Sequence, residues 1–367
     1  MIRPGKGRWR PMVRTTSSRI AAAALLALVA SGTPTAAQVT IPAGGPFVHD
    51  VRPGPGVTAT KKLSDYLPSL AKTPGDSDVY VLQGSEPGAT VFVAGGTHAN
   101  EIAGIMAATV LVERARVRQG RLIVLPHANN SAVTWTDPKR PGPEWFTIPT
   151  ASGERRFKFG ARLTRPHDQG APDPEKYHHP ASSELLDGTE FRNLDRAYPG
   201  RADGTLTERI AFAVVQLLRA EDVDVAVDFH EAGPESRLAW MIVANPKNIE
   251  AGAVAVLALE AAGVDMKLEP SSETFRGLSH REWGDATKAR SFLFETPSPS
   301  MVEAGRRVDP VNDPKLPLAK RVAVHLASLA AVVDASVEDA PPSKKFSVLD
   351  LPGLQEMTRA GVGAFLK

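Results

Sequence analysis

The sequence predicts an α/β fold in which helices flank a largely central β-sheet. Several short segments are continuously apolar, as expected for strands that are buried on both faces. These segments alternate with stretches of helical periodicity. With 367 residues, of which 42% are hydrophobic, the chain is long and apolar enough to bury a substantial core. We therefore expect a single α/β domain.

The predicted elements follow one another in strand and helix alternation. We expect strands at residues 79–82, 90–94, 122–126, 223–229, 239–243 and 291–294. We expect helices at residues 101–117, 207–219, 248–262 and 317–333.

Residues 1–37 have the pattern of an export signal. Basic residues precede a short apolar run at 20–29, and small residues lead to Thr35-Ala36-Ala37 before Gln38. The apolar run at 20–29 is shorter than a permanent membrane-spanning helix requires. We expect cleavage before Gln38, no stable membrane anchor afterwards, and a periplasmic or secreted protein. The alternative is an N-terminal helix buried in the fold.

The charge of the mature chain differs from that of the whole. The formal net charge is +2, but residues 1–37 hold six basic residues and no acidic one. Without them, 37 basic and 41 acidic residues remain, a net charge near −4. No basic stripe is visible after that point, so we expect no nucleic-acid partner. Because the chain has no cysteine, a metal site must use His, Asp and Glu.

Composition divides the remaining chain into three parts, one of which contains an insertion. Residues 38–75 are rich in Pro and Gly and are expected to be a lead-in with little regular structure. A catalytic domain is expected at 76–336, and 337–367 form a C-terminal tail that is either docked or loose. Within the domain, 131–190 hold eight prolines and little periodicity, which indicates an insertion.

His98 and Glu101 stand three residues apart where a predicted strand turns into a helix. Gly95 and Gly96 precede them and permit a sharp backbone path. Such a turn can aim an imidazole and a carboxylate at one point, although a His-x-x-Glu pair alone is common.

His230 stands where another buried strand ends, in Asp228-Phe229-His230-Glu231. In open α/β sheets, ligands gather beyond the carboxyl ends of strands. His98, Glu101 and His230 together make the two-His-one-Glu set of a catalytic zinc site. Asp228 and Glu231 are either partners that orient an imidazole or solvated carboxylates.

Glu295 ends a third apolar strand, and we expect it at the same edge of the sheet. A carboxylate beside a catalytic zinc can take a proton from water and pass it to a leaving amine. The alternative is a carboxylate at a strand end that is exposed to solvent and has no role in catalysis.

Arg192 and Arg196 lie in the loop Phe191-Arg-Asn-Leu-Asp-Arg-Ala-Tyr-Pro-Gly200. A planar guanidinium binds a carboxylate through two hydrogen bonds, which suits a substrate with an acid group. We expect Arg192 to stabilise an oxyanion, and we assign Asn193, Asp195 and Arg196 to substrate binding. The alternative is surface arginines that pair with Asp195 or Glu190.

Four motifs in order carry a family resemblance: Gly-Thr-His-Ala-Asn-Glu (96–101), Asn-Leu-Asp-Arg-Ala-Tyr-Pro-Gly (193–200), Asp-Phe-His-Glu-Ala (228–232) and Phe-Glu-Thr (294–296). Together they resemble the succinylglutamate desuccinylase/aspartoacylase branch of the zinc carboxypeptidase superfamily. The resemblance implies one zinc ion on His98, Glu101 and His230, and Glu295 as general base. It also implies Arg196 on a substrate carboxylate and a mixed eight-stranded sheet.

The chain departs from that family in three places. Asp195 stands where the family usually has Asn, which places a carboxylate in the anion-binding pattern. No tyrosine follows Tyr198, so the role of the carboxypeptidase tyrosine is vacant or falls to Arg276, His280 or Arg281. The segment after Glu295 is short and helical in pattern, so the C-terminal β-domain of aspartoacylases is expected to be missing.

We expect a zinc hydrolase that cleaves an amide bond in a small-molecule or peptide substrate bearing a carboxylate, as an N-acyl amino acid deacylase does. One alternative is a metallocarboxypeptidase acting on peptides or cell-wall peptides. Another, from a different class, is a catalytically silent binding protein that keeps the fold.

The insertion is expected to line an open cleft through its aromatic residues Trp135, Trp145, Phe146, Phe157 and Phe159. The alternative is that these side chains pack against the domain.

Overall fold

The computed structural model describes residues 49–139, 142–301 and 309–367, so the expected signal at 1–37 lies outside the described residues. The strands are β1 (Ala59–Lys62), β2 (Asp78–Gln83), β3 (Glu86–Ala94), β4 (Arg116–Leu125), β5 (Trp145–Thr150), β6 (Gly153–Lys158), β7 (Lys176–Tyr177), β8 (Leu186–Asp187), β9 (Val225–Ala232), β10 (Met241–Ala244), β11 (Lys267–Pro270), β12 (Arg290–Pro297) and β13 (Ser347–Leu349). The helices are α1 (Ile102–Arg114), α2 (Asn130–Val133), α3 (Leu206–Ala220), α4 (Ile249–Ala261), α5 (Ser279–Ala286), α6 (Leu318–Val337) and α7 (Leu354–Ala360).

A mixed central sheet confirms the predicted fold class. Its strand order is β1-β2-β4-β3-β9-β12-β10-β11, and β13 pairs with β4. The four central strands β4, β3, β9 and β12 run parallel, while β1, β2, β10 and β13 each pair antiparallel with a neighbour. Parallel strands end at the same edge, so β3, β9 and β12 deliver their carboxyl ends to one place.

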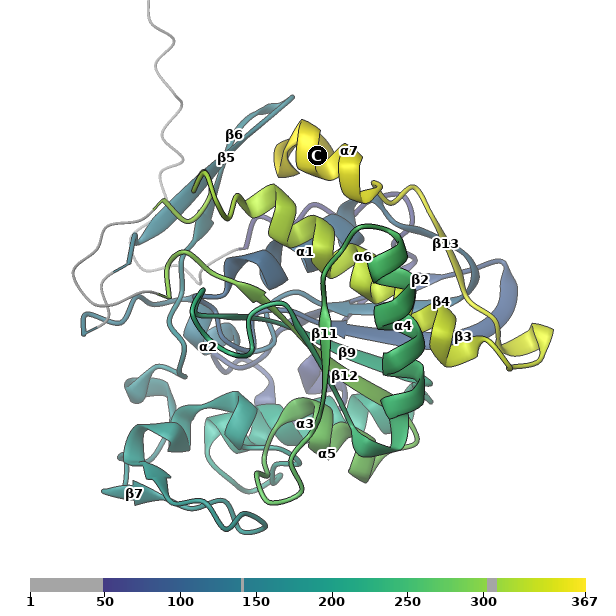
Figure 1. The fold of residues 1–367 in the computed structure, drawn as a ribbon. Helices are drawn as coiled ribbons and strands as arrows, with labels where there is room; N and C mark the ends of the chain where they lie inside the picture. The colour runs from purple at the N-terminus through teal and green to yellow at the C-terminus, as the bar shows by residue number, and fades with distance from the viewer. Residues whose placement is uncertain (1–48, 140–141, 302–308) are drawn as a thin grey trace, which may run out of the picture. The chain divides into compact units, whose positions relative to one another are not determined.

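Helices cover both faces of this sheet (Figure 1). The larger core cluster joins one face of the strands to α1, α4, α6 and α7. The smaller cluster joins the other face to α3 and to Trp283 of α5. Side chains alternate between the two faces along each strand. In β9, Phe229 therefore faces the α1 and α6 layer, whereas His230 faces the α3 and α5 layer. Among the described helices, none is long and apolar enough to cross a membrane.

Several boundaries differ from the sequence-based expectations. The first helix ends at Arg114 rather than at 117, because the chain turns extended at Ala115 and enters β4. The lead-in was expected to have little regular structure, yet Ala59–Lys62 pairs with β2 as an edge strand. The sheet has nine strands among the described residues rather than eight, because β13 adds a short antiparallel pairing.

The segment after β12 forms no separate β-domain within the described part of the chain, as expected. It consists of α6, the three-residue β13 and α7. Met357 of α7 is fully buried in the same core cluster as α1 and α6. The C-terminal tail is therefore docked on the domain.

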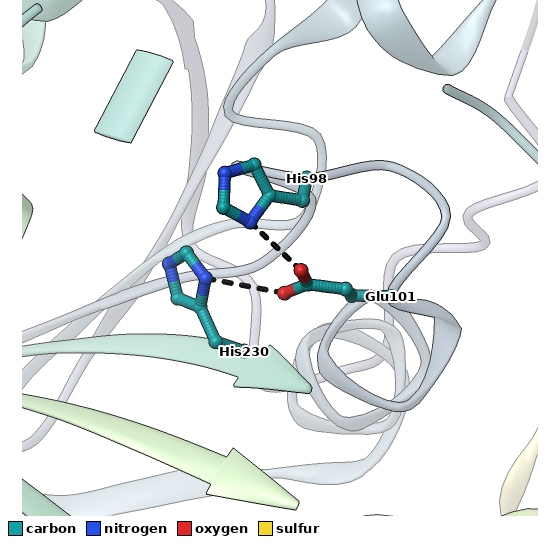
Figure 2. Close-up of side chains that lie close together, drawn as sticks. All are labelled: His98, Glu101 and His230. Carbon is teal, nitrogen blue, oxygen red and sulfur yellow. Dashed lines mark hydrogen bonds and ion pairs between the residues drawn. The ribbon is translucent and has the colours of Figure 1, made fainter. Parts of the chain in front are cut away.

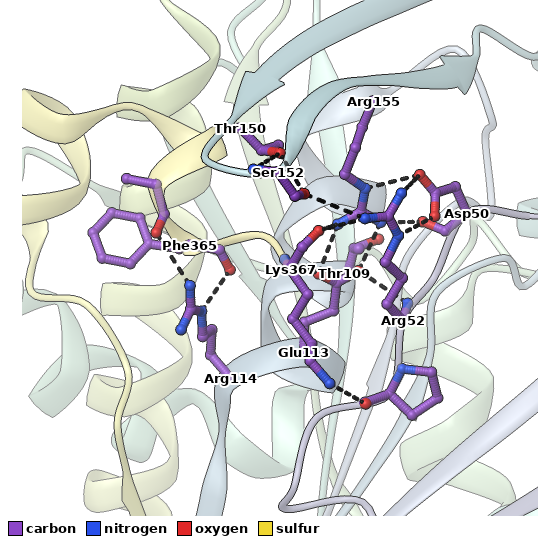
Figure 3. Close-up of polar contacts among 12 residues, drawn as sticks. Asp50, Arg52, Thr109, Glu113, Arg114, Thr150, Ser152, Arg155, Phe365 and Lys367 are labelled. Atoms are coloured by element: carbon purple, nitrogen blue, oxygen red, sulfur yellow. Dashed lines mark hydrogen bonds and ion pairs between the residues drawn. The ribbon is translucent and has the colours of Figure 1, made fainter. Parts of the chain in front are cut away.

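The insertion contains a hairpin, β5–β6, that packs on the domain. Phe146, Phe157 and Phe159 are buried in the larger core cluster. Figure 3 shows Arg155 of the hairpin between Glu113 of α1 and Asp50, with Arg155 Nη1 2.7 Å from Glu113 Oε2. The expectation that these phenylalanines line a cleft is therefore wrong, because their rings fill the space between the hairpin and the domain.

Candidate metal centre

A sharp turn between β3 and α1 brings His98 and Glu101 to the sheet edge. Gly96 has φ +71°, a left-handed conformation that favours glycine. The Glu101 N–H then donates to the His98 carbonyl at 3.1 Å, which closes the turn. A Cβ on Gly95 would lie 2.6 Å from the carbonyl oxygen of Gly104, so this glycine lets α1 approach the strand. The glycine pair predicted to shape this path does so.

His98, Glu101 and His230 converge, as Figure 2 shows. His98 Nδ1 lies 2.8 Å from Glu101 Oε1, and His230 Nδ1 lies 3.1 Å from Glu101 Oε2. The two imidazole rings are 4.8 Å apart between centroids and nearly perpendicular, at 87°. All three side chains are buried. Two ring nitrogens of the same kind therefore face a single carboxylate.

The outer nitrogens of both imidazoles are held by other side chains. His98 Nε2 hydrogen-bonds to Asn193 Oδ1 at 2.9 Å. His230 Nε2 lies 2.9 Å from Asp228 Oδ2, and the Thr97 hydroxyl donates to the same carboxylate at 3.0 Å. Contacts of this kind fix the tautomer and orientation of a metal-binding histidine. They leave each Nδ1 directed to the centre.

Burial and mutual charge shift the pKa values within the cluster. Burial lowers the pKa of His98, as does the Arg162 guanidinium. Burial alone would raise the pKa of Glu101, but the charges and contacts of His98 and His230 hold it well below its usual value. Burial alone would also lower the pKa of His230, but Asp228 and Glu101 hold it well above its usual value.

The donor set fits a zinc ion. Two imidazole nitrogens and one carboxylate are the ligands of many catalytic zinc sites. The three ligand atoms lie within 4.8 Å of one another. A second group, formed by Asp195, Asp228 and His230, is equally close. It uses the side of His230 that Asp228 already contacts, so the first group is better suited to hold an ion.

Glu295 lies beside His230 and Glu101, at the sheet edge where the strand-end argument predicted it. Register pairs it with His230 across the parallel strands β12 and β9, so both side chains face the same layer. Burial and the nearby Glu101 carboxylate raise the pKa of Glu295 well above its usual value. Its Oε2 has no hydrogen-bond partner among the described residues. A carboxylate of this kind is suited to proton transfer.

Arg162 also reaches the centre, although no sequence motif indicated it. Its Nη1 lies 3.2 Å from His98 Nδ1 and 3.5 Å from Glu101 Oε1. The insertion places it there, because Ala99 N donates to Ala161 O at 2.9 Å. A Cβ on Gly160 would lie 2.5 Å from the Ala99 side chain, so a glycine permits this approach. The insertion thus contributes a guanidinium to the site, although its phenylalanines do not line it.

One donor atom of Arg196 makes no hydrogen bond among the described residues. The side chain lies over the Phe275 ring at 4.4 Å, and its Nη1 is 3.5 Å from Asp195 Oδ2. Burial lowers the pKa of Arg196. Its buried Nε has no hydrogen-bond partner in the described part of the chain, although Glu190 Oε2 lies 3.7 Å away.

Asn193 and Asp195 make contacts within the protein. The Asn193 amide also donates to Glu190 Oε2 at 2.7 Å. Asp195 Oδ1 accepts the Ser279 N–H at 2.7 Å, at the start of α5. This contact stabilises the carboxylate that stands where the resembled family usually has Asn.

Arg192 does not join the cluster. It forms a two-pronged ion pair with Asp173, at 2.7 and 3.0 Å, and Nη1 donates to the Thr164 carbonyl at 2.7 Å. The role of oxyanion stabiliser predicted for Arg192 is therefore not supported, because these contacts hold its donors in the insertion.

The three residues considered in place of the carboxypeptidase tyrosine differ in how far their side-chain nitrogens are already bonded. Arg276 is paired with Glu282 through two contacts, at 2.7 and 2.8 Å. Arg281 Nε lies 3.0 Å from Asp285, while its Nη1 has no hydrogen-bond partner among the described residues. His280 is buried, hydrogen-bonds to Ser271 Oγ at 3.0 Å, and has an unpartnered Nδ1 among the described residues. The pKa of His280 is lowered to about 4, chiefly by burial. The Asp195 carboxylate opposes this shift, and the charge of His230 adds to it.

Comparisons with known proteins agree with the motif resemblance. No family model matches the chain. Over 148 residues, 40% of this chain, it is 28% identical to N-alpha-acetyl-L-2,4-diaminobutyric acid deacetylase of Halomonas elongata, of which it spans 29%. A succinylglutamate desuccinylase from a Silicibacter species is 20% identical, with 70% of this chain and 60% of that one covered and a TM-score of 0.44. A metallo-carboxypeptidase from Burkholderia cenocepacia is 13% identical, with 78% and 66% covered and a TM-score of 0.47. The chain spans less than two thirds of each of these proteins, and it is similar to a deacetylase, a desuccinylase and a carboxypeptidase.

Proposed function

We propose that the protein is a zinc-dependent hydrolase that cleaves an amide bond in a substrate bearing a carboxylate. The convergence of His98 Nδ1, His230 Nδ1 and the Glu101 carboxylate carries this proposal. Beside it lies Glu295, whose Oε2 has no hydrogen-bond partner among the described residues. A bound zinc ion supplies Lewis acidity, which makes water more acidic and polarises a carbonyl group.

The side chains around the centre divide the remaining work. Glu295 accepts the proton of the attacking water and returns it to the leaving nitrogen. Arg162 donates hydrogen bonds to the negative charge that develops on the carbonyl oxygen. Arg196 binds the substrate carboxylate through its Nε, which makes no hydrogen bond among the described residues, and Phe275 fixes the plane of the guanidinium.

The substrate class that we favour is N-acyl amino acids. The similar protein from Halomonas elongata is named as a deacetylase of an N-acetylated amino acid, and this supports the choice. We also propose that the protein acts in the periplasm or outside the cell, on the strength of the signal pattern at residues 1–37.

Turnover of a substrate panel tests the proposal. Zinc-loaded protein is incubated with N-acetyl and N-succinyl amino acids and with short peptides, and the release of free amine is measured. We expect hydrolysis of N-acyl amino acids, loss of activity with a chelator, and its return with zinc. Hydrolysis of peptides alone would establish a carboxypeptidase instead. Tight zinc binding with no turnover of any member would favour a silent binding protein.

A further inference from the structure

Strand alternation places a second set of polar residues directly behind the metal centre. Register pairs His230 with Glu295 and Glu231 with Thr296 across β9 and β12. His230 and Glu295 face the centre, so Glu231 and Thr296 face the opposite layer. There α6 meets both residues. Arg321 Nη1 binds Glu231 Oε1, and His325 Nε2 lies 3.1 Å from Thr296 Oγ1.

Glu231 connects the two segments that carry the metal ligands. Its backbone N–H donates to Glu101 Oε2 at 2.9 Å, so it holds the carboxylate that both histidines face. Its side-chain Oε2 accepts the N–H of Ala103 at 2.9 Å, in the first turn of α1. Glu231 thus joins the end of β9 to the start of α1.

Arg321 has no exposed surface, and each nitrogen of its guanidinium donates a hydrogen bond. Besides Glu231, it donates from Nε to Leu316 O at 3.1 Å and from Nη2 to Pro310 O. Removing two charges from water is costly, and a buried ion pair often contributes no more stability than an apolar pair of equal volume. This buried pair differs from a purely structural one because Glu231 also contacts Glu101 and Ala103.

We propose that Arg321 is a positioning residue of the metal centre. By holding Glu231 from α6, it fixes Glu101 and His230 in their converging arrangement and so sets the affinity for zinc. This inference rests on the zinc site of the proposed function.

The test compares zinc affinity with fold stability. Arg321→Met removes the charge but keeps much of the side-chain volume. The zinc dissociation constant is measured by competition with a chelator, and unfolding by urea is followed on the metal-free protein. We expect zinc to bind about 10- to 100-fold more weakly, as is typical when a contact that orients a metal ligand is lost.

Arg155→Met is the matched control. The Arg155–Glu113 pair is as buried as the Arg321–Glu231 pair, but it lies between the hairpin and α1 (Figure 3). We expect a comparable loss of unfolding free energy and less than about a twofold change in zinc affinity, because distant sites act independently. Equal weakening of zinc binding in both variants would overturn the inference.

Two milder variants, Arg321→Lys and Glu231→Gln, keep the test decisive if Arg321→Met does not fold. With Co²⁺ in place of zinc, each is expected to change the visible spectrum of the metal, and Lys is expected to preserve more of the wild-type affinity than Met. Wild-type spectra and affinities in both variants would refute the role of Arg321 while leaving the zinc site intact. Absence of zinc binding in the wild type would instead remove the proposed function, and this inference with it.

Discussion

Adjacent residues at the centre serve different purposes. Asn193 holds the outer nitrogen of His98, Asp195 binds the first N–H of α5, and Arg196 keeps its Nε without a partner among the described residues. A buried donor without a partner costs free energy that a bound ligand can recover. Of the three, Arg196 is therefore the residue that we expect to contact the substrate.

Glu295→Gln separates proton transfer from metal binding. The amide keeps the shape of the side chain but cannot accept a proton from water. We expect kcat to fall by about a hundredfold or more, the range of general acid–base catalysis, with zinc content unchanged. Steady-state kinetics and metal analysis of the same sample check this. Near-normal turnover would assign the base to another residue.

Arg162 and Arg192 make a matched pair of arginines from neighbouring loops. Arg162 lies 3.2 Å from His98 Nδ1, whereas Arg192 is bound to Asp173 and Thr164. We expect Arg162→Met to lower kcat by about 10²- to 10³-fold, as the loss of one oxyanion donor does. Arg192→Met is expected to lower the urea midpoint and to change kcat little. The reverse pattern would restore the role first predicted for Arg192.

At the scale of elements, the sequence predicted those that hydrophobic burial determines. Strands β3, β9 and β12 each contain a continuous apolar run, and their common direction places His98, His230 and Glu295 at one edge. Short edge strands such as β11 and β13 have weak patterns, because their pairing depends on distant partners. Arg162 was missed and Arg192 was misassigned for a similar reason. Arg162 contacts His98 and Arg192 contacts Asp173 only in the folded chain, and local sequence does not indicate which partner each arginine has.

The hairpin β5–β6 is expected to stabilise the domain rather than to select substrates. Phe157 is 7% exposed and packs at 5.5 Å from Phe146 between ring centroids. Phe157→Ala is expected to lower the free energy of unfolding by about 3–5 kcal/mol, as buried Phe→Ala changes do. In the folded fraction, kcat/KM for long and short substrates is expected to be unchanged. Urea unfolding and steady-state kinetics check this. A fall in kcat/KM for long substrates alone would instead indicate that the hairpin lines the substrate cleft.

For the whole molecule, buried histidines make stability depend on pH. Burial, together with the nearby charges of Arg321 and His230, lowers the pKa of His325 from 6.5 to about 3. Below pH 6.5 the unfolded chain therefore takes up a proton that the folded protein does not accept until about pH 3. Stability is lost as the pH falls through this window, by up to about 1.4 kcal/mol per pH unit for each such histidine.

His325→Gln is expected to flatten this dependence between pH 6 and 4 in the metal-free protein. Urea unfolding at several pH values measures the slope. His167→Gln is the control, because the His167 side chain is 86% exposed. This substitution is expected to give the same slope as the wild type. An equal slope in the His325 variant and the wild type would contradict the argument.

Zinc stoichiometry tests the metal centre most directly. Purified protein is saturated with zinc, freed of excess metal, and assayed for bound zinc in the wild type, His98→Ala, His230→Ala and the exposed control His167→Ala. We expect one zinc per chain in the wild type and the control. Each of the other two variants loses one of three protein ligands and is expected to retain little zinc. Full occupancy in both His98→Ala and His230→Ala would contradict the assignment of the metal to His98, Glu101 and His230.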